Sequence, residues 1–417
     1  MDMDTRWLNL PDGLIYPPPV ALHAGRGERS QVAGSGRSDH SEGQRIGFYI
    51  PSLAVGGAER VTVTIANGLA ARGHDVELVI SHSRGRLRED VSPDVAVNEL
   101  ATSRVPVAGI GAHILPLARY LRETDRTLVF AEKIDAGVVC MLAHHLVGGD
   151  TPVVPVVHSA FGVSEETTLK RRVTDLAASR LLPTADHVVA VSDGVARSVR
   201  DASAVRPNDV TVLHNPVDIE SVQERARDPV NHEWVEDDRV DLVLSVGRLE
   251  PQKDHETWLR AFALVHETRP NTRAIIAGKG SQREALLELA QDLGLSEVVS
   301  IPGYVDNPYR YMDRASLFVL SSRFEGLPTV LIEALACGCP IVATDCPSGP
   351  REILENGTYG SLAPVGDARV IAERVLETLD EPPSSDVLLD RADDFAPGVV
   401  FDAYDRFIES CARPLSR

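Results

Sequence analysis

The chain is poor in cysteine, in aromatic residues and in positive charge. Its 417 residues include five cysteines and 5% aromatic residues, and 61 acidic residues outnumber 42 lysines and arginines, for a formal net charge of −19. An odd number of cysteines in so long a chain does not fit a disulfide framework, so we expect a reducing compartment. The acidic balance argues against nucleic acid as a partner, although a local basic patch can still meet phosphates.

Long hydrophobic runs are also missing. No stretch of about 18 apolar residues predicts a helix that spans a bilayer, and the N-terminus lacks the basic-then-apolar pattern of a secretory signal. We therefore expect a cytoplasmic protein. The 43% apolar and 25% charged residues are ordinary for a globular enzyme. Because 417 residues exceed one hydrophobic core, two or three domains are expected.

The chain divides into five segments. Residues 1–44, with YPPPV and a stretch rich in Gly, Ser, Arg and Glu, are expected to form a disordered leader. Residues 45–216 and 239–383 each alternate apolar strands with amphipathic helices, which is typical of parallel sheets covered on both faces. Residues 217–238 are the expected interdomain linker. Residues 384–417 are expected to be helical and to pack back toward the N-terminal domain.

The predicted fold class is therefore α/β, with two doubly wound Rossmann-like domains and a cleft between them. Ligands of such domains bind at the carboxyl ends of the strands. The predicted strands of the first domain are 45–51, 76–80, 128–131, 153–158, 187–192 and 210–216, and those of the second are 241–247, 274–278, 298–305, 317–322 and 340–345.

One stretch, SSRFEGLPTVLIEALACGCPIVATDCPSG at 321–349, combines two carboxylates with a helix start. Pro328 suits a first helical turn, where its missing N–H is not needed. Glu325 precedes this helix and Glu333 lies inside it, so both can reach one ligand across the helix N-terminus. Such a terminus favours anions, and carboxylates accept hydrogen bonds from hydroxyls. The pattern favours a ligand with a diphosphate and sugar hydroxyls.

Helix stabilisation is the alternative explanation for these acids. An acid near a helix N-terminus stabilises the helix by about 0.3–1 kcal/mol without any ligand, which can account for Glu325. It does not account for Glu333, because a carboxylate within an otherwise apolar helix needs a partner.

Two cations follow the strand predicted at 241–247. Arg248 and Lys253 lie on one loop with Pro251 between them, and together they can neutralise a diphosphate in the ground state or as a leaving group. A solvated surface pair is the alternative, since most arginines and lysines are exposed.

Gly56-Gly57 and His158 follow strands of the first domain. Gly57 opens a helix after the first strand, where a backbone approaches a ligand closely, although a plain tight turn explains the two glycines equally well. His158 ends the strand at 153–158, at an edge where doubly wound domains bind ligands. A structural histidine is the alternative.

Six motifs occur in a fixed order along the chain: GGAER (56–60), VLHNPVD (212–218), VGRLEPQKD (246–254), AGKGSQRE (277–284), PGYVDN (302–307) and EGLPTVLIEALACGCPIVATD (325–345). Together they resemble the family 4 glycosyltransferases, of the group 1 type and the GT-B fold. The resemblance covers roughly residues 45–380 and is strongest in the C-terminal half. Members of this family are retaining enzymes that use nucleotide-sugar donors.

The resemblance implies a role for each matching residue. Arg248 and Lys253 would contact the donor diphosphate, Glu325 the transferred sugar, and Glu333 the ribose hydroxyls. His158 would lie near the reacting sugar, so that His158, Glu325, Arg248 and Lys253 form the catalytic set. The remaining donor-binding residues would be Gly57, Gly278, Val305, Leu327, Pro328 and Thr329, with Val305 meeting the base through its backbone.

The implied function is transfer of a sugar from a nucleotide donor, with UDP as the expected nucleotide, to an acceptor hydroxyl with retention of configuration. The pathway would be polysaccharide, lipopolysaccharide or lipid-linked glycan synthesis, with a sugar or lipid-linked acceptor. We expect no cofactor and no metal, because Cys337, Cys339 and Cys346 lack the usual zinc spacing and because Arg248 and Lys253 can supply the positive charge.

Two alternatives remain on the sequence alone. A UDP-sugar 2-epimerase-like isomerase shares the two-domain architecture, although the Arg-Lys pair with E-x7-E does not resemble that class. A non-catalytic sugar-nucleotide-binding protein would keep the same donor residues.

A membrane-bound acceptor would require a peripheral docking surface on the inner face of the plasma membrane. Arg119, Arg122 and the run Lys170-Arg171-Arg172 could supply its positive charge. A solvated helix face explains these cations equally well.

Overall fold

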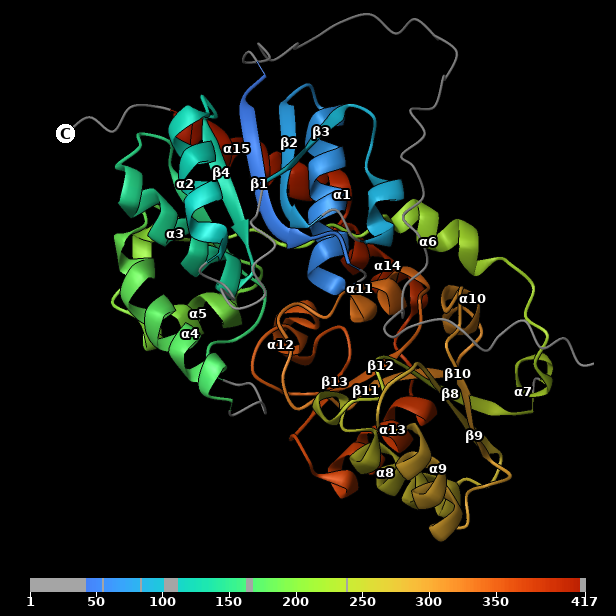
Figure 1. The fold of residues 1–417 in the computed structure, drawn as a ribbon. Helices are drawn as coiled ribbons and strands as arrows, with labels where there is room; N and C mark the ends of the chain where they lie inside the picture. The colour runs from blue at the N-terminus through green and yellow to red at the C-terminus, as the bar shows by residue number, and fades with distance from the viewer. Residues whose placement is uncertain are drawn as a thin grey trace, which may run out of the picture.

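A computed structural model of the chain describes residues 43–412, apart from residue 55 and residues 83–84, 101–111, 163–167 and 238. The predicted leader at 1–44 therefore lies outside the described residues, except for its last two positions. Two parallel sheets, each flanked by helices, form the two lobes of the molecule (Figure 1).

The first sheet has seven strands in the order β3-β2-β1-β4-β5-β6-β7. Its strands are β1 Arg45–Ser52, β2 Asp75–His82, β3 Val95–Glu99, β4 Leu128–Glu132, β5 Val153–Val157, β6 Val188–Ala190 and β7 Val210–Val212. Helices cover both faces, which is why central strands such as β4 and β5 are buried at every position. The strand order reverses between β1 and β4, the point where a doubly wound sheet opens a crevice for ligands.

The second sheet has six strands in the order β10-β9-β8-β11-β12-β13 and reverses in the same way between β8 and β11. Its strands are β8 Asp241–Val246, β9 Thr272–Ala277, β10 Val299–Gly303, β11 Leu317–Leu320, β12 Ile341–Thr344 and β13 Ser361–Ala363. The two doubly wound sheets predicted from the sequence are confirmed. Strands β3 and β13 were not predicted, because each buries only one residue and neither VAVNE nor SLA stands out as a buried apolar run.

Helices connect most of the successive strands, and the last two helices of the second lobe follow its final strand. Those of the first lobe are α1 Gly57–Ala71, α2 Ile114–Glu123, α3 Ile134–Val147, α4 Leu169–Leu181 and α5 Asp193–Ala202. Those of the second are α8 His255–Thr268, α9 Arg283–Asp292, α10 Tyr309–Met312, α11 Thr329–Ala336, α12 Pro350–Ile353, α13 Ala368–Asp380 and α14 Ser385–Asp393. The helix predicted from Gly57 begins there, and its Ile65 and Leu69 are fully buried as their spacing requires.

The segment between the lobes is helical. It contains α6 Ile219–Ala226 and α7 Glu233–Glu236, and α6 buries Ile219, Val222 and Ala226 while it packs on α10 and α11. One hydrophobic core runs from the first sheet through α6 and α11 to one face of the second sheet. A smaller core fills the opposite face of the second sheet.

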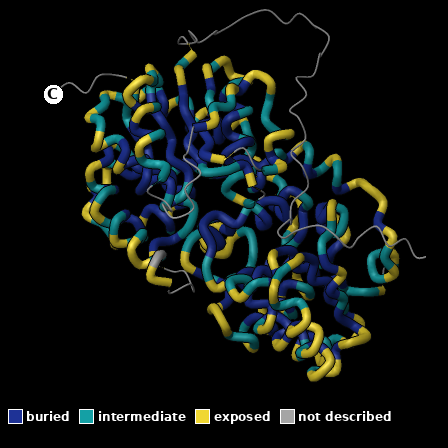
Figure 2. Tube along the Cα trace, in the orientation of Figure 1, coloured by how far each residue is buried: buried dark blue, intermediate teal, exposed yellow. Residues whose placement is uncertain are grey.

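The last helix, α15 Pro397–Ala412, lies against the first lobe rather than the second (Figure 1). It contacts α1 and β4, and Arg72 at the end of α1 forms ion pairs with Asp402 and Asp405. Chain segments that are far apart in sequence thus tie the two lobes together. Figure 2 shows the sheets buried in both lobes and the exposed positions on the outer helices.

Candidate active site

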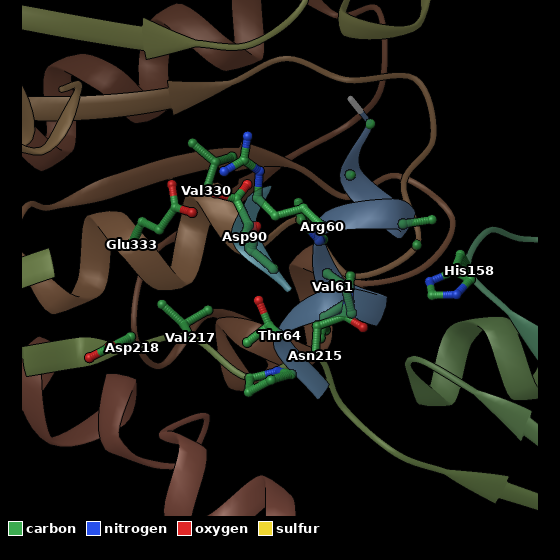
Figure 3. A pocket seen from close by; sticks show the side chains of 18 of the residues that line it. Arg60, Val61, Thr64, Asp90, His158, Asn215, Val217, Asp218, Val330 and Glu333 are labelled. Atoms are coloured by element: carbon green, nitrogen blue, oxygen red, sulfur yellow. The ribbon is translucent and has the colours of Figure 1, made fainter. Parts of the chain in front are cut away.

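A cavity of about 1250 Å³ lies between the lobes, at the carboxyl ends of both sheets. Residues from α1, from the loop after β5 and from the loops after β8 and β11 line it together. Figure 3 shows it with Arg60 on α1 between Glu333 on one side and His158 on the other. Both crevices expected from the strand orders therefore open into one space.

Nine of the eleven predicted catalytic and donor-binding residues line this cavity: Gly57, His158, Arg248, Lys253, Glu325, Leu327, Pro328, Thr329 and Glu333. They come from both halves of the chain, so the fold brings together what the motifs left far apart.

Gly278 and Val305 are not among the lining residues. Gly278 has φ +157°, and a Cβ atom there would lie 1.8 Å from the carbonyl oxygen of Gly247, so only glycine fits where the ends of β8 and β9 meet. Val305 is half-buried and packs against the core. Their predicted contacts with the donor remain predictions, and the packing gives Gly278 a structural reason of its own.

Lys253 and Glu325 form a buried ion pair at the centre of the site. The Lys253 ammonium lies 2.5 Å from Glu325 Oε1, and the two side chains are 11% and 9% exposed. Two serines after β11 support the pair: Ser322 Oγ donates to Glu325 Oε1 at 2.6 Å, and Ser321 Oγ donates to the Lys253 carbonyl at 2.7 Å. The sequence did not predict this contact, because the partners are separated by 72 positions.

Gln252 joins the same two loops and was also missed. Its Nε2 donates to the carbonyl of Phe324 at 2.9 Å, and its own carbonyl accepts from the amide of Arg323 at 2.8 Å. Arg248 donates to Gln252 Oε1 at 2.8 Å and is otherwise exposed. Gln252 therefore holds Arg248 beside the cavity mouth with its guanidinium accessible to a ligand.

The N-terminus of α11 points into the space between the lobes. Thr329 is its first residue and Pro328 caps it from outside, one position before the first turn expected for this proline. Gly326 precedes them, and a Cβ atom there would lie 1.9 Å from the His158 carbonyl. Only glycine allows the two lobes to approach this closely. In addition, Ser192 Oγ of the first lobe donates to the Gly326 carbonyl at 2.9 Å.

Glu333 is a buried carboxyl at the edge of the cavity. It is 5% exposed, and burial raises its pKa to about 7, although the charges of Arg60 and Arg225 and a hydrogen bond from Thr329 lower it. Its Oε2 atom accepts no hydrogen bond from any residue that the structure describes. The described residues therefore satisfy this acid only in part, which leaves Oε2 available to a ligand.

His158 lies on the first-lobe side, directly after β5. Its Nε2 atom is 2.6 Å from Oε2 of Glu132, a carboxylate that is 2% exposed at the end of β4. Sequence reasoning did not include Glu132. The available signal was an acid that ends the apolar strand LVFAE, at the same sheet edge as His158.

Further lining residues were missed or set aside. Arg60 of the GGAER motif lines the cavity, whereas its neighbour Glu59 pairs with Lys133 at 2.7 Å. Asn215, in the VLHNPVD motif, also lines it and is 6% exposed, and its Oδ1 atom has no hydrogen-bond partner among the described residues. A polar residue near the end of the strand predicted at 210–216 was the signal that could have identified Asn215.

Potential metal ligands do not gather anywhere in the described part of the chain, where no group of three or more His, Cys, Asp or Glu side chains could hold an ion. Cys337, Cys339 and Cys346 are free thiols. Burial raises the pKa of the Cys346 thiol to about 12, which disfavours the thiolate that binds metals.

Two family models match the chain in adjoining halves. The model described as "Glycosyltransferase Family 4" matches residues 55–221, and the model described as "Glycosyl transferases group 1" matches residues 227–394. The first match covers the lobe with Gly57 and His158, and the second covers the lobe with the Lys253–Glu325 pair.

Curated relatives match over most of the chain. One is N-acetylgalactosamine-N,N'-diacetylbacillosaminyl-diphospho-undecaprenol 4-alpha-N-acetylgalactosaminyltransferase of Campylobacter jejuni, which is 26% identical over 81% of this chain and 91% of the relative. Another is the lipopolysaccharide core biosynthesis glycosyltransferase LpsE of Rhizobium meliloti, which is 26% identical over 85% of this chain and 96% of the relative.

Solved structures share the fold. HepE of Anabaena, crystallised with UDP, superposes with a TM-score of 0.72 at 20% identity, over 88% of this chain and 100% of that chain. The lipopolysaccharide outer core galactosyltransferase WaaB gives a TM-score of 0.69 at 20% identity, over 88% of this chain and 99% of that chain.

Proposed function

This chain belongs to the family 4 glycosyltransferases of the group 1 type, and we propose that it transfers a sugar from a uridine diphosphate donor to an acceptor hydroxyl with retention of configuration. Its two Rossmann-like lobes form a GT-B fold, and it is a transferase. The donor, the stereochemical course and the independence from metal belong to the proposal.

The observation that carries this proposal is the Lys253–Glu325 pair beside the N-terminus of α11, inside a cavity shared by both lobes. A cation and a helix N-terminus together favour an anionic group, and a diphosphate fits both. The adjacent carboxylate of Glu325 accepts hydrogen bonds from sugar hydroxyls. A sugar diphosphate is the ligand that uses all three.

Catalysis then rests on charge stabilisation of the leaving group. When the bond between the anomeric carbon and the phosphate oxygen breaks, its electron pair goes to the diphosphate. Lys253, the accessible guanidinium of Arg248 and the backbone N–H groups of Leu327 and Thr329, all from residues that line the cavity, would stabilise that charge. The acceptor oxygen bonds to the anomeric carbon on the same face, and its proton goes to the departing phosphate oxygen, so no protein nucleophile is needed.

The nucleoside end is assigned to Glu333. A buried carboxyl with a hydrogen-bonding oxygen left unused is suited to the two ribose hydroxyls, which would donate to it. UDP is favoured as the nucleotide because HepE, which has the same fold, is described in complexes with UDP and with UDP-glucose.

Lipid-linked acceptors are favoured by the similarity to the Campylobacter relative, which is named as a diphospho-undecaprenol glycosyltransferase. A peripheral membrane contact is part of this proposal. No helix in the described ranges is both long and apolar enough to cross a bilayer, whereas α4 exposes Leu169, Val173 and Leu176 by 55–78% along one stripe. Such a stripe suits the interface of an anionic membrane when cations flank it.

The cations expected at that surface divide between two roles. Arg172 on α4 is exposed, as are Arg119 and Arg122 on α2. Arg171 instead lines the cavity and pairs with Asp175 at 3.1 Å, so its charge faces the active site. The side chain of Lys170 lies outside the described part of the structure.

Metal independence is proposed on the charge already present. Arg248, Lys253 and the α11 amides provide the positive field that a divalent ion supplies elsewhere. Turnover should therefore be unchanged when EDTA is added and when magnesium or manganese is supplied.

A donor screen tests the proposal. Release of nucleoside diphosphate is measured from a panel of nucleotide sugars, with and without soluble and diphosphopolyprenol-linked acceptors. We expect slow release from one UDP-sugar alone and stimulation by the correct acceptor. Conversion of a UDP-sugar to its C2 epimer without UDP release would instead indicate an isomerase, and binding without either product would indicate a silent binding protein.

A further inference from the structure

The end of β4 holds a carboxylate to which the proposed reaction has given no role. Glu132 is the last residue of this strand and is 2% exposed. In the parallel pairing of β4 with β5, Glu132 lies opposite Val156, two positions before His158. The register of the sheet therefore fixes the carboxylate next to the histidine, and Glu132 Oε2 lies 2.6 Å from His158 Nε2.

The hydrogen bond between them determines where the ring proton lies. An ionised carboxylate only accepts, so the ring nitrogen must donate, and the proton is on Nε2. Nδ1 makes no hydrogen bond to any residue in the described ranges, while His158 lines the cavity with 14% of its side chain exposed. In a neutral ring protonated on Nε2, Nδ1 then carries a lone pair that no described residue uses.

The buried surroundings of Glu132 favour its hydrogen bond with His158. Tyr404 of α15 is buried nearby, and its pKa is raised well above the ordinary value, first by burial and then by the negative charge of Glu132. A buried carboxylate without a donor is strongly unfavourable. His158 is therefore the described side chain that holds Glu132 in place, and Glu132 in turn holds the ring of His158.

Lys133, the residue after Glu132, supports the other part of the site in the first lobe, which is the turn that contains Gly57. Lys133 adopts φ +80° and ψ 152°, a positive-φ conformation that is strained for a residue with a side chain. Its ammonium lies 2.7 Å from Glu59, and Glu59 is packed beside Gly56, so that a Cβ atom on Gly56 would lie 2.3 Å from its carboxylate. Two consecutive residues thus support His158 and the turn that contains Gly57.

We propose that Glu132 is a positioning residue for His158. Its carboxylate fixes the imidazole as the Nε2–H tautomer, so that Nδ1 faces the cavity as a hydrogen-bond acceptor for a hydroxyl of the transferred sugar or of the acceptor. The identity of that hydroxyl rests on the proposed function. The tautomer and its dependence on Glu132 do not.

The tautomer is measured without substrate, by long-range ¹H–¹⁵N correlation spectra of protein labelled with ¹⁵N-histidine. The signal of His158 is assigned by its loss in His158→Ala. We expect a protonated Nε2 and an unprotonated Nδ1 in the wild type, and mixed tautomers in Glu132→Leu, which removes the acceptor. A protonated Nδ1 in the wild type, or an unchanged single tautomer in Glu132→Leu, overturns the proposal.

Kinetics then test whether the positioning matters for the reaction. Glu132→Gln and Glu132→Leu should lower kcat by about 10- to 100-fold, the range seen when a carboxylate that orients a histidine is removed. The dissociation constant of UDP should stay unchanged. In a His158→Ala background the same substitutions should cause no further loss, because the two residues act as one unit.

Glu77→Gln is the matched control. Glu77 is a half-buried carboxylate on β2 of the same sheet, bonded to Tyr120 at 2.7 Å, and it does not line the cavity. Its substitution should leave kcat unchanged. An equal loss in the control, or a full additional loss in the His158→Ala background, contradicts positioning. If the wild type transfers no sugar at all, the proposed function fails while the tautomer measurement still decides the role of Glu132.

Discussion

Glu333→Gln is expected to make the folded protein more stable at alkaline pH, although it removes a residue of the proposed active site. Glu333 is 5% exposed, and burial raises its pKa from 4.5 to about 7. A carboxyl whose folded pKa lies above its unfolded pKa binds protons more tightly in the native state. Stability is therefore lost as pH rises from about 4.5 through about 7 and stays constant above that range.

The magnitude follows from the pKa values. Raising a carboxyl pKa from 4.5 to about 7 costs the ionised folded state about 3 kcal/mol, at roughly 1.4 kcal/mol per pKa unit. A glutamine at this position is neutral at every pH and nearly isosteric, so it avoids this cost. Wild type and variant should have similar stability at pH 5, and the variant should gain up to about 3 kcal/mol at pH 8.5.

The assay is thermal unfolding of both proteins between pH 5 and pH 8.5 without nucleotide. For a domain of 150–250 residues, about 1 kcal/mol corresponds to roughly 2–4 °C in Tm, so the difference at pH 8.5 should reach several degrees. Glu77→Gln serves as a control in which Tm should fall instead of rise. Glu77 accepts a hydrogen bond from Tyr120 at 2.7 Å and pairs with Arg126, so its replacement removes stabilising contacts.

Nucleotide binding gives a second readout. If the Glu333 carboxylate accepts from ribose hydroxyls, its replacement loses hydrogen bonds to a charged group, which are worth about 1.5–3 kcal/mol. The variant should therefore bind UDP at least about tenfold more weakly while being more stable. A variant with equal Tm difference at pH 5 and pH 8.5, or with unchanged affinity for UDP, would refute the reasoning.

Three further predictions concern other parts of the site. Lys253→Ala should abolish most turnover and also lower Tm, because it leaves Glu325 buried without its ion partner. The double variant Lys253→Ala/Glu325→Gln should recover Tm without recovering turnover. The control Lys279→Ala, at a residue that does not line the cavity, should change neither Tm nor turnover. Gly326→Ala should lower both Tm and turnover, because its Cβ would lie 1.9 Å from the His158 carbonyl; normal values for this variant would show that the lobes do not need this contact. Leu169→Glu should weaken flotation with anionic vesicles but leave transfer to a soluble acceptor unchanged. If the protein binds zwitterionic vesicles as well as anionic ones, the proposed docking surface is contradicted.

The sequence predicted the fold well because the signals were local. Buried strands such as LVFAE and DLVLSV stand out as apolar runs, and their alternation with helices predicts parallel sheets. The strands that were missed, β3 and β13, lie at sheet edges and bury only one residue each, so they lack a long apolar run. Their existence depends on pairing with neighbours, which no local pattern records.

The site was predictable only in part, for the same reason. Glu325, Glu333, Arg248 and Lys253 belong to motifs with fixed spacing, and the fold brings all four to one cavity. Glu132 was missed because its meaning depends on the register between β4 and β5.

Contacts between segments that are distant in sequence could not be predicted from the motifs either. The contact of Gln252 with Phe324 joins two loops that are distant in sequence. Gly278 shows the converse case, since close packing of two strand ends requires a glycine there whether or not the residue also contacts the donor.

The most direct test of the central claim is ¹H NMR of the reaction between an α-linked UDP-sugar and a diphosphopolyprenol-linked acceptor in the presence of EDTA. The spectra identify the first product formed. We expect equal molar amounts of free UDP and of a product that keeps the α configuration at the transferred sugar. In Lys253→Ala, we expect neither UDP nor this product to form. A β-linked product, strict dependence on an added divalent metal, or an epimerised UDP-sugar without UDP release would contradict it.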